Sequence, residues 1–406
     1  MDGPGAKYRP AGSPVDVLMA FLKLGITSFG GPIAHIGYFR EEFVVRRRWL
    51  DEETYADLVG LCQFLPGPAS SQVGFTLGLM RAGYRGALAA WVGFTLPSAI
   101  ALLLFAYGAG GLGGPSGLGL LHGLRLVAVA IVAQAVWGMA RTLCPDRERA
   151  SIALLAALII LFSSSSAAQI MAIVLGGLLG LRFCAGASAP STGQLTLPVS
   201  RRVGIAALTV FFVLLVGLPV LGRLELSPGI ALFEAFYRSG ALVFGGGHVV
   251  LPLLREAFVP PGWVTDDTFL AGYGAAQAVP GPLFTFATYL GTVVKVWPHG
   301  LAGAGLGLIG IFLPGMLILL GTLPFWDSLR ERTNAQAVMR GVKAAVVGLL
   351  AAALYNPLWT SSVLTPGDFG LALAGFVLLV VWRAPPLLVV IISAIGGITL
   401  ALARGA

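Results

Sequence analysis

The sequence predicts an all-α integral membrane protein, a polytopic helical bundle of two homologous halves arranged as an inverted repeat. Three observations lead to this fold class. Of the 406 residues, 57% are hydrophobic and only 11% are charged, whereas soluble proteins carry about 25% charged residues. One long motif occurs twice, and glycine and proline interrupt the apolar segments at corresponding places in both copies. Duplication combined with broken helices is typical of secondary transporters.

Each copy of the motif begins at a glycine break and ends at a proline break. The first copy comprises Phe29-Gly30-Gly31-Pro32, Arg40-Glu41, Trp49, Gln63 and Pro66-Gly67-Pro68. The second comprises Phe244-Gly245-Gly246-Gly247, Arg255-Glu256, Trp263, Gln277 and Pro280-Gly281-Pro282. Glycine and proline interrupt helices, and a broken backbone at membrane depth must be buried in protein or line a cavity. The breaks therefore mark a candidate binding site, reached by broken or re-entrant helices.

In chain order, the first half contains two broken segments followed by four apolar spans. The segment from Val15 to Ile33 holds the glycine break, and residues 58–80 hold the proline break. Amphipathic, basic residues 34–57 separate them. Spans are predicted over 86–107, 120–140, 151–163 and 168–183. The span 151–163 is short for a bilayer that needs about 20 residues, so its ends must extend into the flanking segments.

The second half repeats this order after a linker and one additional helix. We expect a first repeat over 1–183, a linker rich in Ser, Thr, Pro and Gly over 184–202, a connecting transmembrane helix within 203–228 and a second repeat over 229–406. In the second repeat the breaks fall in 229–253 and 268–294. The later spans are predicted over 301–323, 336–356, 368–383 and 386–403.

Basic residues predict the orientation, because loops rich in Lys and Arg remain in the cytoplasm. If both broken segments of each half are re-entrant, every basic cluster falls on the side of the N-terminus, including Arg46-Arg47-Arg48, Arg141, Arg201-Arg202 and Arg330. The connecting helix then carries the second repeat to the opposite face, and the uncharged loop 357–367 lies outside. The two halves therefore have opposite orientations.

Composition and motifs also exclude several classes of function. The net charge of +8 fits basic cytoplasmic loops rather than nucleic-acid binding, for which no motif is present. Cys62, Cys144 and Cys184 are isolated, so neither a disulfide nor a zinc site is expected. We expect no cofactor and no metal. A membrane-embedded enzyme would need paired carboxylates or a metal cluster at membrane depth, and the acids lie mostly at segment ends.

Cations at matched positions suggest that the ligand is an oxyanion. Lys23 and Arg238 lie in the apolar segments just before the two glycine breaks, where a charge is costly and marks a functional site. Helix N-termini at the breaks would add backbone donors. The alternatives are that both side chains reach an interface and that Arg238 pairs with Glu234 at i, i+4.

Several other polar residues recur beside the breaks. Arg40-Glu41 and Arg255-Glu256 suggest a mobile ion pair, with a surface salt bridge as the alternative. Gln63 and Gln277 could donate hydrogen bonds to an oxyanion or to another helix. His35 and His248 lie near the breaks at non-equivalent positions, where packed histidines are expected, and Cys62 is expected to pack.

The motif set resembles the chromate ion transporter (ChrA-type) family in its long, two-domain form. The likeness covers most of the chain and rests on the glycine breaks, the Arg-Glu pairs, the tryptophans and both Gln-x-x-Pro-Gly-Pro sequences. Gly247 stands where the first copy has Pro32. The resemblance implies a secondary active transporter in the inner (plasma) membrane of a prokaryote that exports chromate and gives chromate resistance.

This function leaves three alternatives open: transport of sulfate or another oxyanion, a channel, and the membrane-embedded enzyme. The expected partners are the oxyanion, the lipid bilayer and a coupling proton, and a homodimer is also considered. From the resemblance and the matched charges, the expected substrate-binding and translocation residues are Lys23, Gly30, Gly31, Pro32, Arg40, Glu41, Gln63, Pro66, Gly67, Pro68, Arg238, Gly245, Gly246, Gly247, Arg255, Glu256, Gln277, Pro280, Gly281 and Pro282.

Overall fold

The computed structural model describes residues 12–109, 114–163, 166–184, 199–224, 227–244, 247–330 and 332–403, and every regular element in these ranges is helical. The elements before the connecting helix are α1 (Pro14–Thr27), α2 (Gly31–Phe39), the π-helical turn η1 (Arg40–Arg46), α3 (Glu52–Phe64), α4 (Ala69–Ala109), α5 (Gly114–Leu143), α6 (Arg147–Phe162) and α7 (Ser166–Phe183). The connecting helix is α8 (Arg201–Arg223).

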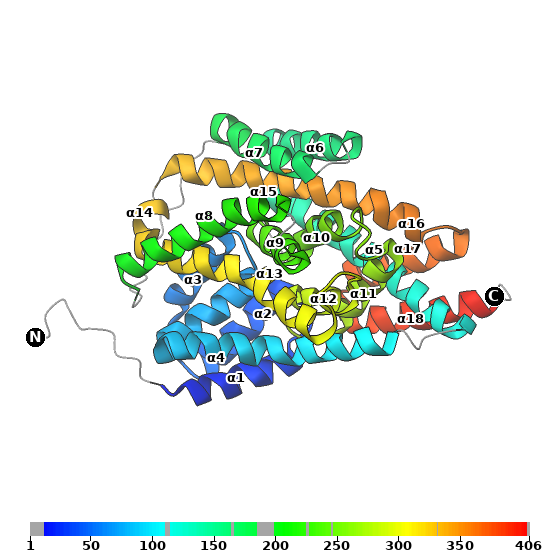
Figure 1. Cartoon of the computed structure of the whole chain (residues 1–406), viewed down its shortest axis with the longest axis horizontal. Helices are drawn as coiled ribbons and strands as arrows, with labels where there is room; N and C mark the ends of the chain where they lie inside the picture. The colour runs from blue at the N-terminus through cyan, green and yellow to red at the C-terminus, as the bar shows by residue number, and fades with distance from the viewer. Residues whose placement is uncertain are drawn as a thin grey trace, which may run out of the picture.

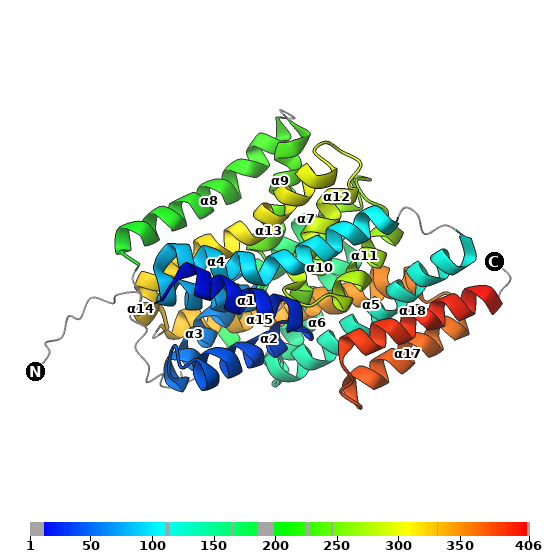
Figure 2. The same cartoon turned by 90° about the horizontal axis from the view of Figure 1, so that it is seen from below.

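The remaining elements are α9 (Pro228–Ala241), η2 (Gly247–Val249), α10 (Val250–Phe258), α11 (Asp266–Ala278), η3 (Leu283–Thr285), α12 (Phe286–Val293), α13 (Gly300–Thr322), η4 (Leu323–Phe325), α14 (Trp326–Arg330), α15 (Thr333–Ala353), η5 (Leu354–Trp359), α16 (Thr360–Ser362), α17 (Pro366–Val380) and α18 (Pro386–Ala403). The long helices run side by side along the longest axis of the molecule (Figures 1 and 2). Both ends of that axis are reached by helices of each half.

Helix starts follow from capping residues in the sequence. Asp51 caps α3 by accepting a hydrogen bond from Thr54 N, and Thr265 caps α11 by accepting one from Thr268 N. A side-chain oxygen at this position satisfies one of the backbone donors that a helix start leaves unpaired. Equivalent helices in the two repeats therefore begin at equivalent places.

By length and apolar composition, six helices in the described ranges could cross a membrane, namely α4, α5, α8, α13, α15 together with its C-terminal turns, and α18. The helix α4 is a hairpin rather than one long rod, because Ala82 and Gly83 leave helical geometry. Gly78 then packs against Gly86 and Ala90, although 12 residues of straight helix would separate positions 78 and 90 by about 18 Å. The chain therefore reverses where the basic residues Arg81 and Arg85 end the first broken segment.

The last two helices of each half pack against a helix of the other half. The helix α18 packs on α5, and α6 and α7 pack on α15, as both views show (Figures 1 and 2). Glycines permit the close approach: Gly123 of α5 touches Ser393 of α18, and Gly341 of α15 touches Gly176 and Gly180 of α7. Small residues at such contacts let membrane helices pack closely. The core is therefore shared by the two repeats.

The predicted breaks are present in the described residues. The chain leaves helical geometry between Thr27 and Gly31, between Phe64 and Ala69, and between Ala278 and Leu283. Gly245 and Gly246 lie outside the described residues, as does most of the predicted linker, residues 185–198. The helix α8 occupies most of the segment 203–228 in which a connecting helix is expected, and it lies along one edge of the molecule in Figure 2.

Candidate anion-binding site at the helix breaks

The two glycine breaks contact each other. At the first break, Gly30 has φ of 101° and Gly31 has φ of 77°, a region that side chains with a Cβ avoid. Across from it, a Cβ placed on Gly247 would lie 3.1 Å from Cγ of Pro32. Pro32 and Gly247 are equivalent residues of the two repeats. Contact between equivalent residues is what a two-fold relationship produces near its axis.

The proline breaks cross over to the opposite glycine breaks. Gly67 N donates a hydrogen bond of 2.7 Å to Val243 O, and Gly281 N donates one of 3.0 Å to Ser28 O. Val243 and Ser28 are the residues that precede the equivalent Phe244 and Phe29. Each repeat therefore satisfies a backbone carbonyl at the broken helix end of the other, and the contacts are reciprocal.

Both proline breaks also press against a helix of the other repeat. A Cβ on Gly67 would lie 2.9 Å from Cα of Gly315, and a Cβ on Gly281 would lie 2.9 Å from Oγ of Ser98. Gly315 and Ser98 each follow an intrahelical proline, Pro314 in α13 and Pro97 in α4. The four breaks and these two proline-containing helix segments thus form one interlocked centre.

Helices begin at all four breaks. In the described residues, α2 starts at Gly31, α4 at Ala69, η2 at Gly247 and η3 at Leu283. The N-terminal end of a helix carries unpaired N–H donors and the positive end of the helix dipole. The convergence of such ends favours an anion.

The cations before the glycine breaks are both paired with carboxylates. Lys23 Nζ lies 3.5 Å from Oε2 of Glu42, and Arg238 Nε lies 2.8 Å from Oε1 of Glu234. The second pair is the i, i+4 alternative that the sequence left open. The Lys23 side chain is 52% exposed and that of Arg238 is 28% exposed. Neither cation is a bare charge in the core.

Glu42, in the η1 turn that follows the first glycine break, contacts three cations. It accepts hydrogen bonds from Arg46 at 2.8 Å and from Arg47 at 2.7 Å, besides its contact with Lys23. Burial raises the pKa of this carboxyl, but the Arg47 hydrogen bond and the nearby positive charges outweigh it, so the pKa of Glu42 lies below its ordinary value. Glu42 is therefore held ionised.

The arginines of the two Arg-Glu pairs bind acids other than their neighbours. Arg40 Nε donates to Oε1 of Glu52 at 2.7 Å, and Arg255 donates to both oxygens of Asp266, at 2.8 and 2.9 Å. In both copies the arginine binds an acid further along the chain, because adjacent side chains do not face each other on a helix. A mobile ion pair at Arg40-Glu41 and Arg255-Glu256 stays a prediction. The acids that pair are the first residues of α3 and α11. They are equivalent in the two repeats.

The predicted glutamines and histidines occupy different surroundings. Gln63 is exposed, whereas the amide nitrogen of Gln277 is buried without a hydrogen-bond partner. His248 Nδ1 lies 2.8 Å from the hydroxyl of Tyr273. His35 is fully buried beside Ser70, with 3.4 Å between Nδ1 and Oγ. Cys62 is a buried packing residue in the first repeat, as predicted.

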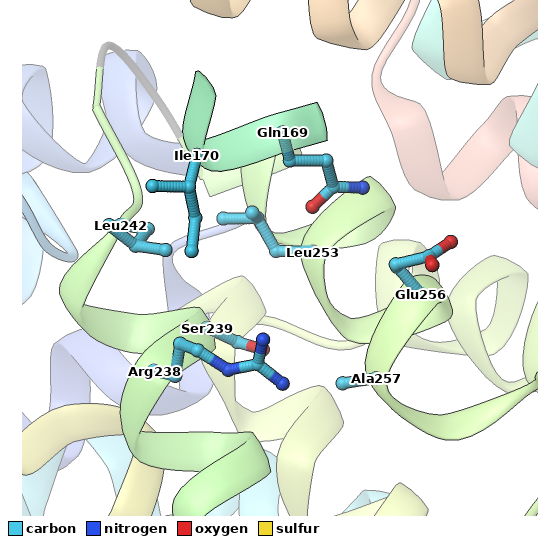
Figure 3. A pocket seen from close by; sticks show the side chains of 8 residues that line it. All are labelled: Gln169, Ile170, Arg238, Ser239, Leu242, Leu253, Glu256 and Ala257. Atoms are coloured by element: carbon cyan, nitrogen blue, oxygen red, sulfur yellow. The ribbon is translucent and has the colours of Figure 1, made fainter. Parts of the chain in front are cut away.

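A small cavity lies beside the second glycine break (Figure 3). Arg238 and Ser239 of α9 face Glu256 and Ala257 of α10 across it, and Gln169 of α7 closes one side. Its volume is about 10 Å³, the space of a single water molecule. A tetrahedral oxyanion does not fit there without movement of α9 or α10.

Sequence reasoning missed the polar residues that follow the first proline break. Gln72 is fully buried, and its Nε2 donates hydrogen bonds to Pro66 O at 2.9 Å and to Gly315 O at 2.8 Å. It thereby ties the break to the other repeat. The available signal was Ser70-Ser71-Gln72 in an apolar segment, where the second copy has Phe284-Thr285-Phe286.

Comparison with known proteins identifies the family. The family model described as chromate transporter matches residues 15–181 and again residues 230–398. The "Chromate transport protein" of Pseudomonas aeruginosa is 29% identical over 387 residues, 93% of this chain and 89% of the relative. The "Probable chromate transport protein" of Synechococcus elongatus is 27% identical over 96% of both chains, and the "Chromate transport protein" of Cupriavidus metallidurans is 25% identical over 83% of this chain and 81% of the relative.

No solved structure matches the chain. The family match nevertheless spans both repeats with their glycine and proline breaks. The protein therefore belongs to the chromate transporter family.

Proposed function

We propose that the protein is a secondary active transporter that exports chromate across the plasma membrane and thereby gives chromate resistance. The observation that carries the proposal is the interlocked centre, in which Gly67 bonds to Val243 and Gly281 bonds to Ser28. Four helix starts meet there, and helix N-termini bind oxyanions. The relatives named as chromate transport proteins point to the same substrate.

We further propose that the halves form an inverted repeat and alternate access to this centre. The reciprocal contacts between equivalent residues and the mutual exchange of terminal helix pairs support a two-fold relationship. The positive-inside pattern supports opposite orientations. Rocking of one repeat against the other about the breaks would then open the centre to each side in turn.

In this mechanism the glycine and proline breaks hold the anion, while the matched cations provide charge during its passage. Lys23 and Arg238 would exchange their carboxylates for the substrate as it enters. Arg40 with Glu52, and Arg255 with Asp266, would join each glycine-break segment to the helix leading into the proline break. Export against a gradient needs a driving ion, and the proton-motive force is the proposed source.

Flux measurements in everted membrane vesicles test this function. Chromate uptake should require an imposed proton gradient, saturate with chromate concentration and be reduced by excess sulfate. Vesicles from cells that carry Gly67→Val at matched expression provide the control. Sulfate uptake without chromate uptake would reassign the substrate, and gradient-independent single-channel currents would replace the transporter by a channel.

A further inference from the structure

Several positions around the interlocked centre are polar in the first repeat and apolar in the second. Aligning the two copies of the motif places Ser28, His35, Ser70, Gln72 and Thr95 at the positions of apolar residues in the second copy. Those residues are, in the same order, Val243, Val250, Phe284, Phe286 and Phe312. The duplicated backbone therefore carries two chemically different surfaces.

Among the first-repeat residues near the breaks, five side chains without a formal charge are buried and have polar atoms that lack a hydrogen-bond partner. The atoms are Ser28 Oγ, His35 Nε2, Ser71 Oγ, Gln72 Oε1 and Thr95 Oγ1. None of these residues is more than 3% exposed. Leaving a buried polar group without a hydrogen-bond partner costs about 1–3 kcal/mol. Five such groups close to the breaks therefore favour a bound polar ligand at this place.

Contacts connect these residues to the breaks. His35 lies 3.4 Å from Ser70 at the start of α4, and its ring packs edge-on against Phe94 at 5.1 Å. The Phe94 carbonyl in turn lies 3.1 Å from the position of a Cβ on Gly281, and Thr95 is the next residue of that helix. Gly281 completes the connection through its hydrogen bond to Ser28 O.

The corresponding part of the second repeat is more apolar, although Gln277 Nε2 and Thr288 Oγ1 are also buried there without a hydrogen-bond partner. Phe284 packs against Phe312 at 5.8 Å, and Phe286 packs against Phe269 at 5.1 Å. Thr285, the equivalent of Ser71, donates its hydroxyl hydrogen to Pro282 O at 2.7 Å. This surface therefore provides an apolar wall rather than binding groups.

We propose that a tetrahedral oxyanion is bound by uncharged hydrogen-bonding groups of the first repeat, namely Ser28, His35, Ser71 and Thr95, against the aromatic wall of the second repeat. The inference rests on the proposed transport function and names the binding groups within it. Fixed hydroxyl and imidazole N–H donors can stabilise an anion where water is excluded. Gln72 Oε1 is an acceptor, so it would accept a hydrogen bond from a protonated oxyanion or from a neighbouring hydroxyl.

Matched hydroxyl deletions in the two repeats test the proposal. The full chain in lipid nanodiscs is assayed for chromate binding by equilibrium dialysis, with Ser71→Ala, Thr95→Val and Thr285→Ala compared with the unaltered protein. Ser71→Ala and Thr95→Val should each raise Kd about tenfold or more, the effect of losing a hydrogen bond to a charged ligand. Thr285→Ala should leave Kd within about twofold, although it removes a bond within the fold.

Thermal unfolding of each variant without chromate separates folding from binding. Ser71 and Thr95 lose no hydrogen bond from these hydroxyls in the structure, so their variants should keep the melting temperature of the unaltered protein. An unchanged Kd in both variants would overturn the first-repeat site while leaving chromate transport intact. A larger Kd change in Thr285→Ala would move the site to the second repeat, and absence of chromate binding by the unaltered protein would remove the proposed function as well.

Discussion

Gly67 donates its backbone N–H to the carbonyl of Val243 across 2.7 Å, joining the proline break of the first repeat to the broken helix end of the second. The bond satisfies a carbonyl at a helix end, which would otherwise be buried without a hydrogen-bond partner. Its counterpart joins Gly281 to Ser28 at 3.0 Å. Movement of one repeat relative to the other must therefore strain or exchange both bonds, which makes the breaks the mechanical link between the halves.

A bulky side chain at position 67 in place of Gly67 should abolish transport. Its φ of 116° disfavours any side chain, and a Cβ would lie 2.9 Å from the backbone of Gly315. Left-handed backbone costs about 1–2 kcal/mol for a residue with a Cβ, and the backbone contact cannot relax by a rotamer change. Gly67→Val should abolish chromate flux in vesicles. Gly37→Ala is the control, because no atom lies within 4 Å of its Cβ position; equal flux in both variants would show that the break is only a packing feature.

The Glu42 cluster should make the η1 segment of the first repeat sensitive to acid. The pKa of Glu42 is lowered in the folded protein, so its contribution is complete above the ordinary carboxyl pKa and is lost as pH falls through the lower folded value. Glu42→Gln should lower the melting temperature at pH 7 and flatten its decline below about pH 4.5. Glu53→Gln, at an exposed position of the same segment, should leave both unchanged.

That cluster would be only a surface feature if Glu42→Gln matched the unaltered protein at every pH. A change that also appeared in Glu53→Gln would instead indicate a general loss of negative charge. Melting curves of purified protein from about pH 3 to pH 8, at constant ionic strength, distinguish these outcomes because screening of exposed pairs is then held fixed.

The two equivalent arginines should differ in how strongly they bind their acids. Arg255 holds Asp266 through two hydrogen bonds and is 23% exposed, whereas Arg40 holds Glu52 through one and is 50% exposed. Bidentate, partly buried pairs are stronger than exposed ones. A double-mutant cycle on unfolding with Arg255→Gln and Asp266→Asn should give a coupling of about 1–3 kcal/mol. The cycle with Arg40→Gln and Glu52→Gln should give a clearly smaller coupling.

Transport should follow the same order if these arginines join the moving segments. Arg255→Gln should nearly eliminate chromate flux, and Arg255→Lys should leave a reduced flux because lysine keeps the charge but loses the two-point contact. Arg40→Gln should have the smaller effect. Wild-type rate and apparent affinity in both Gln variants would show that the arginines are surface ion pairs and that the substrate charge is met elsewhere.

Local chemistry made the breaks predictable from sequence, because Gly30, Gly67 and Gly281 interrupt helices through their own backbone preferences. The acids that bind Arg40 and Arg255 were not predictable in the same way. Their positions depend on how η1 and α10 return toward the next helix, a tertiary relationship. The contact between Gly67 and Val243 joins residues far apart in the chain, so no local sequence pattern predicts it. The polar stretch Ser70-Ser71-Gln72 can be seen in the sequence. Its significance becomes clear only when it is compared with Phe284-Thr285-Phe286, the corresponding residues of the second copy.

The orientation of the two repeats can be tested with single cysteines in a variant that lacks the three native ones. Positive charges around Arg141 and Arg332 predict that Thr142→Cys and Asn334→Cys face the cytoplasm, and the uncharged loop before α17 predicts that Leu364→Cys faces outside. All three positions are exposed in the structure. A membrane-impermeant maleimide added to intact spheroplasts should therefore label only Leu364→Cys, whereas everted vesicles should show labelling of the other two.

Permeabilised membranes, in which all three should react, provide the control for accessibility. Thr142 lies in the last turn of α5 of the first repeat and Asn334 in the first turn of the equivalent α15 of the second, so cytoplasmic labelling at both means that equivalent helices run in opposite directions. Reaction of Leu364→Cys from the cytoplasm would exclude the inverted arrangement, and with it alternating access by rocking of two opposed halves.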